Sequence, residues 1–136
     1  MRLHKLKRKL QVQGTVFSGK GEGSKFTSLT WVKTQTEEKL GFIPFPGTLN
    51  IRLDNKNASK LWKALNKAEP IELVPVADFC RGRCYRVTLE DKTECALLIP
   101  QVADYPKDMV EIVSPVNLRE KLKLSDGNMV ELTLFV

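Results

Sequence analysis

Short segments of alternating apolar and polar residues, separated by turn residues, recur through this chain of 136 residues. Such alternation predicts β-strands with one buried face. Tight turns between consecutive segments favour antiparallel pairing. Six or seven short strands leave many edges, and closing the sheet into a small barrel hides them. The expected strands cover residues 10–18, 48–53, 71–76, 84–89, 95–99, 109–113 and 129–136.

Two or three short helices are expected beside the strands. Residues 31–40 have weak helical character and end at Gly41, a residue suited to a C-terminal cap. Residues 118–124 form a short helical turn that Asn117 can cap. The clearest helix is marked by four apolar residues at helical spacing, with Asn57 as its candidate cap. These four residues are Ala58, Leu61, Trp62 and Leu65.

Positive charge is concentrated at the N-terminus. The net charge is +6, and without the five basic side chains of residues 1–9 the chain keeps 17 basic and 16 acidic residues. We therefore interpret residues 1–9 as a basic tail and residues 10–136 as a single domain without a domain-wide basic surface. Nucleic-acid binding through the tail stays an alternative, and a solvated terminus is the simpler explanation of the charge.

Cysteine and hydropathy patterns exclude further classes of protein. Cys80, Cys84 and Cys95 lack the paired spacing of a zinc site, so we interpret them as reduced thiols used in packing. No apolar run reaches membrane-spanning length and no signal peptide is visible. These observations predict a cytoplasmic protein without a membrane partner, and we expect a monomer.

The segment GFIPFPGTLNIRL, residues 41–53, contains a candidate metal site. Two prolines and Gly47 favour a rigid turn. In the strand that follows, Thr48 and Asn50 share one face while Leu49 points to the other. A hydroxyl and an amide side by side make a pair of oxygen donors that suits Mg²⁺, with substrate phosphates and water as the remaining ligands. Taken alone, the segment is more typical of a simple turn into a strand.

The segment GKGEGSKF, residues 19–26, follows a strand and has three glycines at alternate positions. Backbone N–H groups in such a loop can surround a phosphate, and Lys20 or Lys25 can add charge. The sequence matches neither a Walker A motif nor the dinucleotide-binding fingerprint. A plain glycine-rich hairpin is the alternative, and it is the more usual role of such a loop on its own.

Two charged residues near the C-terminus are further candidates. Glu111 sits in an otherwise apolar strand, where a carboxylate is costly unless it faces solvent or a site. It can serve as a general base or as an acceptor for a substrate hydroxyl. Arg119 can hold a phosphate or a base edge. The alternatives are a solvent-facing glutamate and a surface pair of Arg119 with Glu120.

Together these segments resemble one family, the archaeal-type CTP-dependent riboflavin kinases. The resemblance runs from about residue 10 to the end of the chain, in the family's order. Its most specific parts are Pro-Gly-Thr-Leu-Asn at 46–50 and Glu-x-x-x-Pro-x-x-Leu-Arg at 111–119. The remaining parts are Ser-Gly-Lys-Gly-Glu-Gly at 18–23, Ile99-Pro100 with Tyr105-Pro106, and Asp126-Gly127.

The resemblance implies a mainly β, six-stranded cradle-loop barrel that transfers the γ-phosphate of CTP to the 5′-hydroxyl of riboflavin, giving FMN and CDP. It implies that Thr48 and Asn50 bind Mg²⁺ and that Glu111 faces the ribityl chain. We expect Glu111 to act as the catalytic residue that orients or deprotonates the attacking hydroxyl, since phosphoryl transfer asks a protein mainly for positioning and charge neutralisation. The nucleotide site implied by the family has eleven residues. They are Lys20, Gly21, Glu22, Gly23, Ser24, Lys25, Phe26, Val116, Asn117, Leu118 and Arg119.

One position departs from the family's pattern. Ala103 stands where the family usually has a threonine that contacts the flavin. The missing hydroxyl removes one hydrogen bond, worth about 1 kcal/mol, and Asp104 is a candidate substitute. The departure motivates a second hypothesis, a relative that binds flavin or nucleotide without catalysis. A third hypothesis is a small basic β domain that binds nucleic acid.

Overall fold

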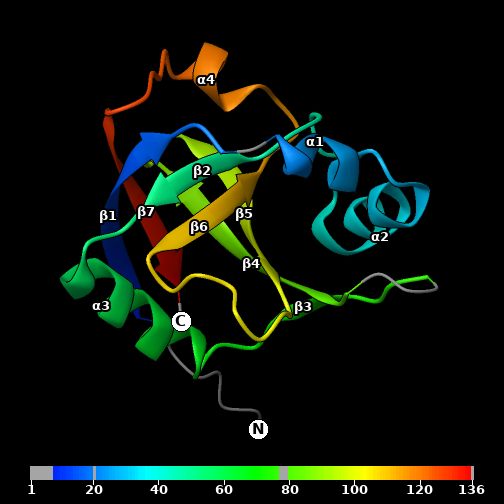
Figure 1. Cartoon of the computed structure of the whole chain (residues 1–136), viewed down its shortest axis with the longest axis horizontal. Helices are drawn as coiled ribbons and strands as arrows, with labels where there is room; N and C mark the ends of the chain where they lie inside the picture. The colour runs from blue at the N-terminus through cyan, green and yellow to red at the C-terminus, as the bar shows by residue number, and fades with distance from the viewer. Residues whose placement is uncertain (1–7, 20, 77–79, 136) are drawn as a thin grey trace, which may run out of the picture.

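The computed structural model describes residues 8–19, 21–76 and 80–135. Most of the predicted basic tail, the loop residue Lys20 and the terminal Val136 lie outside the described residues. Seven strands and four helices form the described part of the chain (Figure 1). The strands are β1 Lys9–Phe17, β2 Leu49–Arg52, β3 Ile71–Leu73, β4 Gly82–Leu89, β5 Thr93–Pro100, β6 Met109–Val113 and β7 Met129–Phe135. The helices are α1 Glu22–Thr27, α2 Thr30–Leu40, α3 Asn55–Leu65 and α4 Leu118–Lys121.

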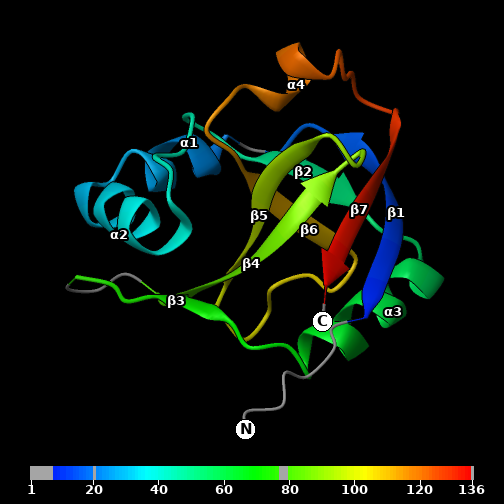
Figure 2. The same ribbon diagram turned by 180° about the vertical axis from the view of Figure 1, so that it is seen from behind.

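The strands form one antiparallel sheet that closes on itself. Its order is β3-β4-β5-β6-β2-β1-β7, and a further pairing of β4 with β7 joins its two sides. Because β3 pairs with β4 alone, the closed ring consists of the other six strands. Figures 1 and 2 show this ring from opposite sides, with α4 at one end and α3 at the other. The predicted six-stranded, mainly β barrel is confirmed.

Three of the four helices occur where the sequence predicted them. The unpredicted helix is α1, which corrects the interpretation of the glycine-rich segment as a plain hairpin. The cap of α3 is also corrected: Asp54, not Asn57, caps the helix by accepting a hydrogen bond from the Asn57 backbone N–H at 2.8 Å. The Asn57 side chain instead accepts a hydrogen bond from the Gln13 backbone N–H at 2.9 Å, which ties α3 to β1. Asn117 caps α4 as predicted.

Strand alternation divides the buried residues between two clusters. Cys95, Leu97 and Ile99 on β5 point into the barrel, where they pack with residues of β1, β2, β6, β7 and α3. Ala96 and Leu98 point outward and pack with α2 and β3. β5 is therefore buried on both faces, which explains its nearly unbroken apolar sequence.

The cysteines are free thiols among the described residues. Burial raises the pKa of both Cys84 and Cys95 to about 12, so these thiols stay protonated near neutral pH and serve in packing, as predicted. In the described ranges, no helix combines the length and apolarity needed to cross a bilayer.

Candidate functional site

Thr48, Asn50 and Glu111 meet on the outer face of the barrel. Antiparallel pairing of β2 with β6 places Asn50 directly opposite Glu111. The Thr48 hydroxyl lies 2.9 Å from Asn50 Oδ1 and 3.2 Å from Glu111 Oε1. As predicted, Thr48 and Asn50 share one face while Leu49 is buried on the other. Glu111 therefore faces this cluster, although a solvent-facing glutamate was the alternative.

A second hydroxyl reaches Glu111 from the loop between β5 and β6. Tyr105 Oη donates a hydrogen bond to Glu111 Oε2 at 2.9 Å. Both oxygens of the carboxylate thus have a donor within reach, Thr48 on one side and Tyr105 on the other. Burial, followed by the neighbouring Glu111, raises the pKa of the Tyr105 hydroxyl well above its usual range. Tyr105 consequently remains a hydrogen-bond donor.

The glycine-rich segment packs directly against the Thr48–Asn50 pair. A side chain at Gly23 would place its Cβ 2.6 Å from Thr48 Oγ1, and one at Gly19 would collide with the Asn50 amide. Glycine is therefore required at these two positions by close approach. The backbone at the start of α1 lies against the two predicted metal ligands, as the sequence hypothesis of a phosphate-binding loop requires.

The turn before β2 is held from both sides. Phe45 N–H donates to the Ser114 carbonyl at 2.7 Å, and Gly47 N–H donates to the Thr27 hydroxyl at 2.9 Å. Gly47 has a φ of 106°, in the region that favours glycine. These bonds hold the turn between α1 and the segment after β6, and the positive φ of Gly47 is the reason that a glycine is favoured there.

A cleft of about 180 Å³ opens beside Thr48. One wall is the turn from Phe45 to Leu49, and the other is the segment from Val116 to Arg119 at the start of α4. Phe45 and Val116 expose 44% and 37% of their surfaces there, so the cleft has apolar sides next to polar donors. The structure thus brings four predicted nucleotide-site residues to the same cleft as Thr48.

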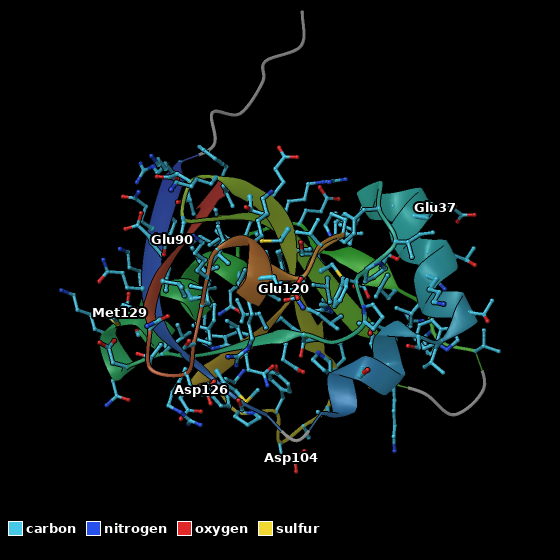
Figure 3. All side chains as sticks on the ribbon, turned by 90° about the horizontal axis from the view of Figure 1, so that it is seen from above. Glu37, Glu90, Asp104, Glu120, Asp126 and Met129 are labelled. Atoms are coloured by element: carbon cyan, nitrogen blue, oxygen red, sulfur yellow. The ribbon has the colours of Figure 1, made fainter. Side chains whose placement is uncertain are left out.

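Arg119 is held in place by the loop that precedes β7. Its Nη2 donates to Asp126 Oδ1 at 2.7 Å, and Asp126 Oδ2 accepts from the Ser18 hydroxyl at 2.7 Å. Hydrogen bonds from Ser18 and Arg119 lower the pKa of Asp126, which keeps it ionised. Figure 3 looks onto this end of the barrel, with Asp126 on the loop beyond α4. The suggested surface pair of Arg119 with Glu120 is wrong, because Asp126 is the partner.

A larger pocket, of about 640 Å³, lies on the other side of Tyr105. Its walls include Trp62 of α3 and the loop residues Ala103, Tyr105 and Lys107. Trp62 anchors the loop, since its Nε1 donates to the Lys107 carbonyl at 2.8 Å and the Lys107 ammonium lies 4.1 Å from the centre of its ring. Ala103 therefore lines the same pocket as Tyr105, whose hydroxyl reaches Glu111.

Some predicted nucleotide-site residues are not brought to the cleft. Phe26 packs edge-on against Trp31, with ring centres 5.7 Å apart, as part of the outer cluster. Ser24 and Lys25 are exposed on α1. Lys20 lies outside the described residues. For these positions the predicted role rests on sequence alone.

Three residues of the site were given no role from the sequence: Ser18, Tyr105 and Asp126. Each lies within a segment that carried the family resemblance, which was the available signal. Their partners are distant along the chain, so periodicity and spacing could not reveal them. The Ser18 and Asp126 side chains, for example, meet across a separation of 108 residues.

The Thr48–Asn50 pair fits a magnesium ion. Cis ligands of an octahedral Mg²⁺, each at about 2.0–2.1 Å, are separated by about 2.9 Å, and the two oxygens lie 2.9 Å apart. Among the described residues, no group of three or more histidine, cysteine or carboxylate side chains is placed to hold a metal. An ion at this pair would therefore need further ligands from a substrate or water.

Comparisons with known proteins point to one family. The model of the family CTP-dep_RFKase, described as "Domain of unknown function DUF120", matches residues 16–134. The riboflavin kinase of Methanosarcina mazei is 41% identical over 125 residues, covering 89% of this chain and 55% of that protein. The riboflavin kinase of Saccharolobus solfataricus is 38% identical over 132 residues, covering 93% of this chain and 75% of that protein.

The chain spans about half the length of the Methanosarcina relatives it matches, since the riboflavin kinase of Methanosarcina barkeri is also covered over only 56% of its length. The matched part nevertheless includes every segment that forms the site described above. The family predicted from the sequence is thereby confirmed: this chain belongs to the CTP-dependent riboflavin kinase family.

Proposed function

We propose that this protein is a riboflavin kinase, a phosphotransferase that makes FMN and CDP from riboflavin and CTP. The observation that carries the proposal is the cluster of Thr48, Asn50 and Glu111, which combines a pair of oxygen donors with a carboxylate beside a cleft. The names of the curated relatives support the same activity. The division into a basic tail and one catalytic domain is part of this proposal.

In the proposed reaction, the 5′-hydroxyl oxygen of riboflavin forms a bond to the γ-phosphorus of CTP. The bond between this phosphorus and the β,γ-bridging oxygen breaks, and CDP leaves with its electron pair. The hydroxyl proton passes to Glu111, or to water oriented by it. Glu111 suits this role because its carboxylate is held at the Thr48 end of the cleft rather than turned into bulk solvent.

The proposed nucleotide site is the cleft between the turn before β2 and α4. Phe45 and Val116 offer apolar surfaces for a base, and Arg119 offers a guanidinium for phosphate or base contacts. The close approach of Gly19 and Gly23 to Asn50 and Thr48 supports a phosphate position at the glycine-rich loop. Preference for CTP over ATP rests on the family description.

Thr48 and Asn50 would hold Mg²⁺ through their side-chain oxygens. A bound Mg²⁺ supplies neutralisation of phosphate charge during transfer. The chain itself sets the spacing of the two oxygens. Because Gly23 has no side chain, the loop backbone can also lie close to Thr48.

The proposed flavin site is the larger pocket next to Tyr105. Trp62 and Tyr105 give it aromatic walls, and the Tyr105 hydroxyl donates a hydrogen bond to Glu111. Ala103 lines this pocket without a hydroxyl, so we expect riboflavin to bind with one hydrogen bond fewer than in a relative that has threonine. A monomeric state, a cytoplasmic location and the absence of nucleic-acid binding stay predictions.

The proposal is tested by a turnover assay. Purified protein, riboflavin and Mg²⁺ are incubated with CTP or ATP in parallel, and FMN is separated by chromatography. Formation of FMN with CTP and not with ATP is the expected result. Formation with ATP alone would overturn the nucleotide assignment.

A second candidate function is favoured by one observation, the alanine at position 103 in the wall of the larger pocket. A binding protein that senses flavin or nucleotide would keep both cavities without turnover. Riboflavin fluorescence distinguishes the two functions: quenching on addition of the protein, together with no FMN in the assay above, would identify the sensor.

A further inference from the structure

The proton of the Thr48 hydroxyl cannot serve both of its neighbours at once. The Thr48 oxygen lies 2.9 Å from Asn50 Oδ1 and 3.2 Å from Glu111 Oε1, and both are acceptors. A hydroxyl donates a single hydrogen bond. The shorter distance favours Asn50 in this structure, so Thr48 alone does not keep Glu111 in one orientation.

Tyr105 is the donor that can hold Glu111 continuously. Its hydroxyl lies 2.9 Å from Glu111 Oε2, on the carboxylate oxygen that Thr48 does not contact. Hydrogen bonds to an ionised carboxylate are stronger than those between neutral groups. A glutamate on a strand otherwise has freedom about three side-chain torsions, and fixing it before a reaction lowers the cost of reaching the productive geometry.

The loop that carries Tyr105 is anchored on both sides of this residue. Its backbone N–H donates to the Val102 carbonyl at 3.3 Å, and its ring packs against the barrel core. Two residues later, the Lys107 carbonyl accepts the bond from Trp62. The hydroxyl is therefore presented to Glu111 by a supported segment, although residues 101–104 are exposed.

Tyr105 also links the larger pocket to Glu111. Its ring forms part of the larger pocket, and its hydroxyl reaches the carboxylate that contacts Thr48 at the smaller cleft. We propose that Tyr105 is a positioning residue, which holds the Glu111 carboxylate toward an acceptor hydroxyl that arrives from the larger pocket. This inference rests on the proposed kinase function and assigns a role within it.

The test is a double-mutant cycle on FMN formation, using Tyr105→Phe, Glu111→Ala and the combined variant. Tyr105→Phe keeps the ring and removes only the hydroxyl. We expect its kcat to fall about tenfold with the KM for CTP unchanged, because the nucleotide cleft keeps its walls. In the Glu111→Ala background the same change is expected to have no further effect on kcat, since residues that act as a unit are not additive.

Thr15→Val is the matched control, because it removes a hydroxyl on β1 that contacts Met129 rather than Glu111 and lies outside both cavities. Its kcat is expected to stay near the wild-type value. Thermal unfolding of each variant, followed by circular dichroism, accompanies the kinetics. If Tyr105→Phe damaged the fold instead, its loss would persist in the Glu111→Ala background.

The outcomes separate the inference from the function on which it rests. Two results would overturn the positioning role while the wild-type protein still made FMN. One is a Tyr105→Phe variant with unimpaired kcat, and the other is an equal loss of kcat on Tyr105→Phe in the wild-type and Glu111→Ala backgrounds. Absence of FMN from the wild-type protein would overturn the kinase, and the positioning role with it.

Discussion

The two cavities proposed as substrate sites are built in different ways. The smaller cleft is formed by a turn and a helix start. The turn donates backbone N–H groups to the Ser114 carbonyl and the Thr27 hydroxyl, and Asn117 caps α4. The larger pocket is lined by side chains of α3 and of the loop after β5, in which residues 101–104 are exposed. The shape of the smaller cleft therefore depends on the conformation of the backbone, whereas the shape of the larger pocket depends on side chains that can be substituted.

This difference implies that the two cavities tolerate substitution unequally. A glycine that must approach Thr48 closely, or a turn that requires a positive φ, leaves few acceptable residues. An exposed loop position such as Ala103 tolerates change more readily. We therefore expect the chemistry at the smaller cleft to be sensitive to single substitutions and binding in the larger pocket to be adjustable.

The strongest test of this comparison removes the oxygen pair. Thr48→Ala combined with Asn50→Ala is expected to lower FMN formation by at least about 100-fold, because it removes both of the closely spaced oxygens that would hold the metal. Activity is measured over a range of Mg²⁺ concentrations and after EDTA treatment. Thr15→Ala, a like substitution on β1, is the control, and turnover that survived the double change would remove the pair from the metal site.

A smaller effect is expected at the side of the cleft formed by α4. Arg119→Ala removes the guanidinium that Asp126 holds at this wall. We expect the KM for CTP to rise about tenfold, as for the loss of a charged hydrogen bond of about 1.5 kcal/mol, while the KM for riboflavin is unchanged. Steady-state kinetics with each substrate varied in turn measures both constants. An unchanged KM for CTP would exclude Arg119 from the nucleotide site.

Gly23→Ala tests whether the backbone approach matters by itself. The added Cβ would lie 2.6 Å from Thr48 Oγ1, so either the loop or the hydroxyl must move. A several-fold loss of kcat is expected, of the order that small misplacements in an active site cause, with a higher Mg²⁺ requirement. Ser28→Ala at the exposed end of α1 is the control for a general disturbance of this helix. Equal losses in both variants would contradict a specific role of Gly23.

The smallest expected effect is at the larger pocket. Ala103→Thr adds the hydroxyl that the resemblance described in the sequence analysis implies for this position. One added hydrogen bond is worth about 1 kcal/mol, which corresponds to a KM for riboflavin lower by about fivefold, with kcat nearly unchanged. Titration of riboflavin fluorescence gives the affinity directly. A loss of affinity would show that the pocket of this chain has adapted to alanine.

Much of the fold could be predicted from local pattern. Strand alternation on β1 and β4, the apolar run of β5 and the caps at Gly41 and Asn117 depend on neighbouring residues, and each was predicted from them. Helix α1 was missed because Gly21 and Gly23 have low helix propensity, and packing against the turn before β2 overrides that propensity. Asp54 was overlooked because Asn57 is also a good capping residue.

The site was predictable to the extent that it lies on paired strands. The shared face of Thr48 and Asn50 follows from strand alternation, and the contact with Glu111 needs only the register of β2 on β6. The bonds of Tyr105 to Glu111 and of Asp126 to Ser18 depend on how loops fold over the barrel. No local rule specifies such contacts, so they could be found only in the folded chain.

The ring of strands has an uneven seam. In the described part of the chain, the β4–β7 pairing is limited to Thr88 with Thr133 and Leu89 with Leu132, extended by one backbone bond from Glu90 N–H to the Glu131 carbonyl. β1 and β7, in contrast, pair along the whole of β7. Local opening follows the weakest part of a structure, so amide hydrogens at the β4–β7 seam should exchange with solvent before those between β2 and β6. Since β2 and β6 lie opposite this seam in the strand order, the barrel can open and reclose there without separating Asn50 from Glu111.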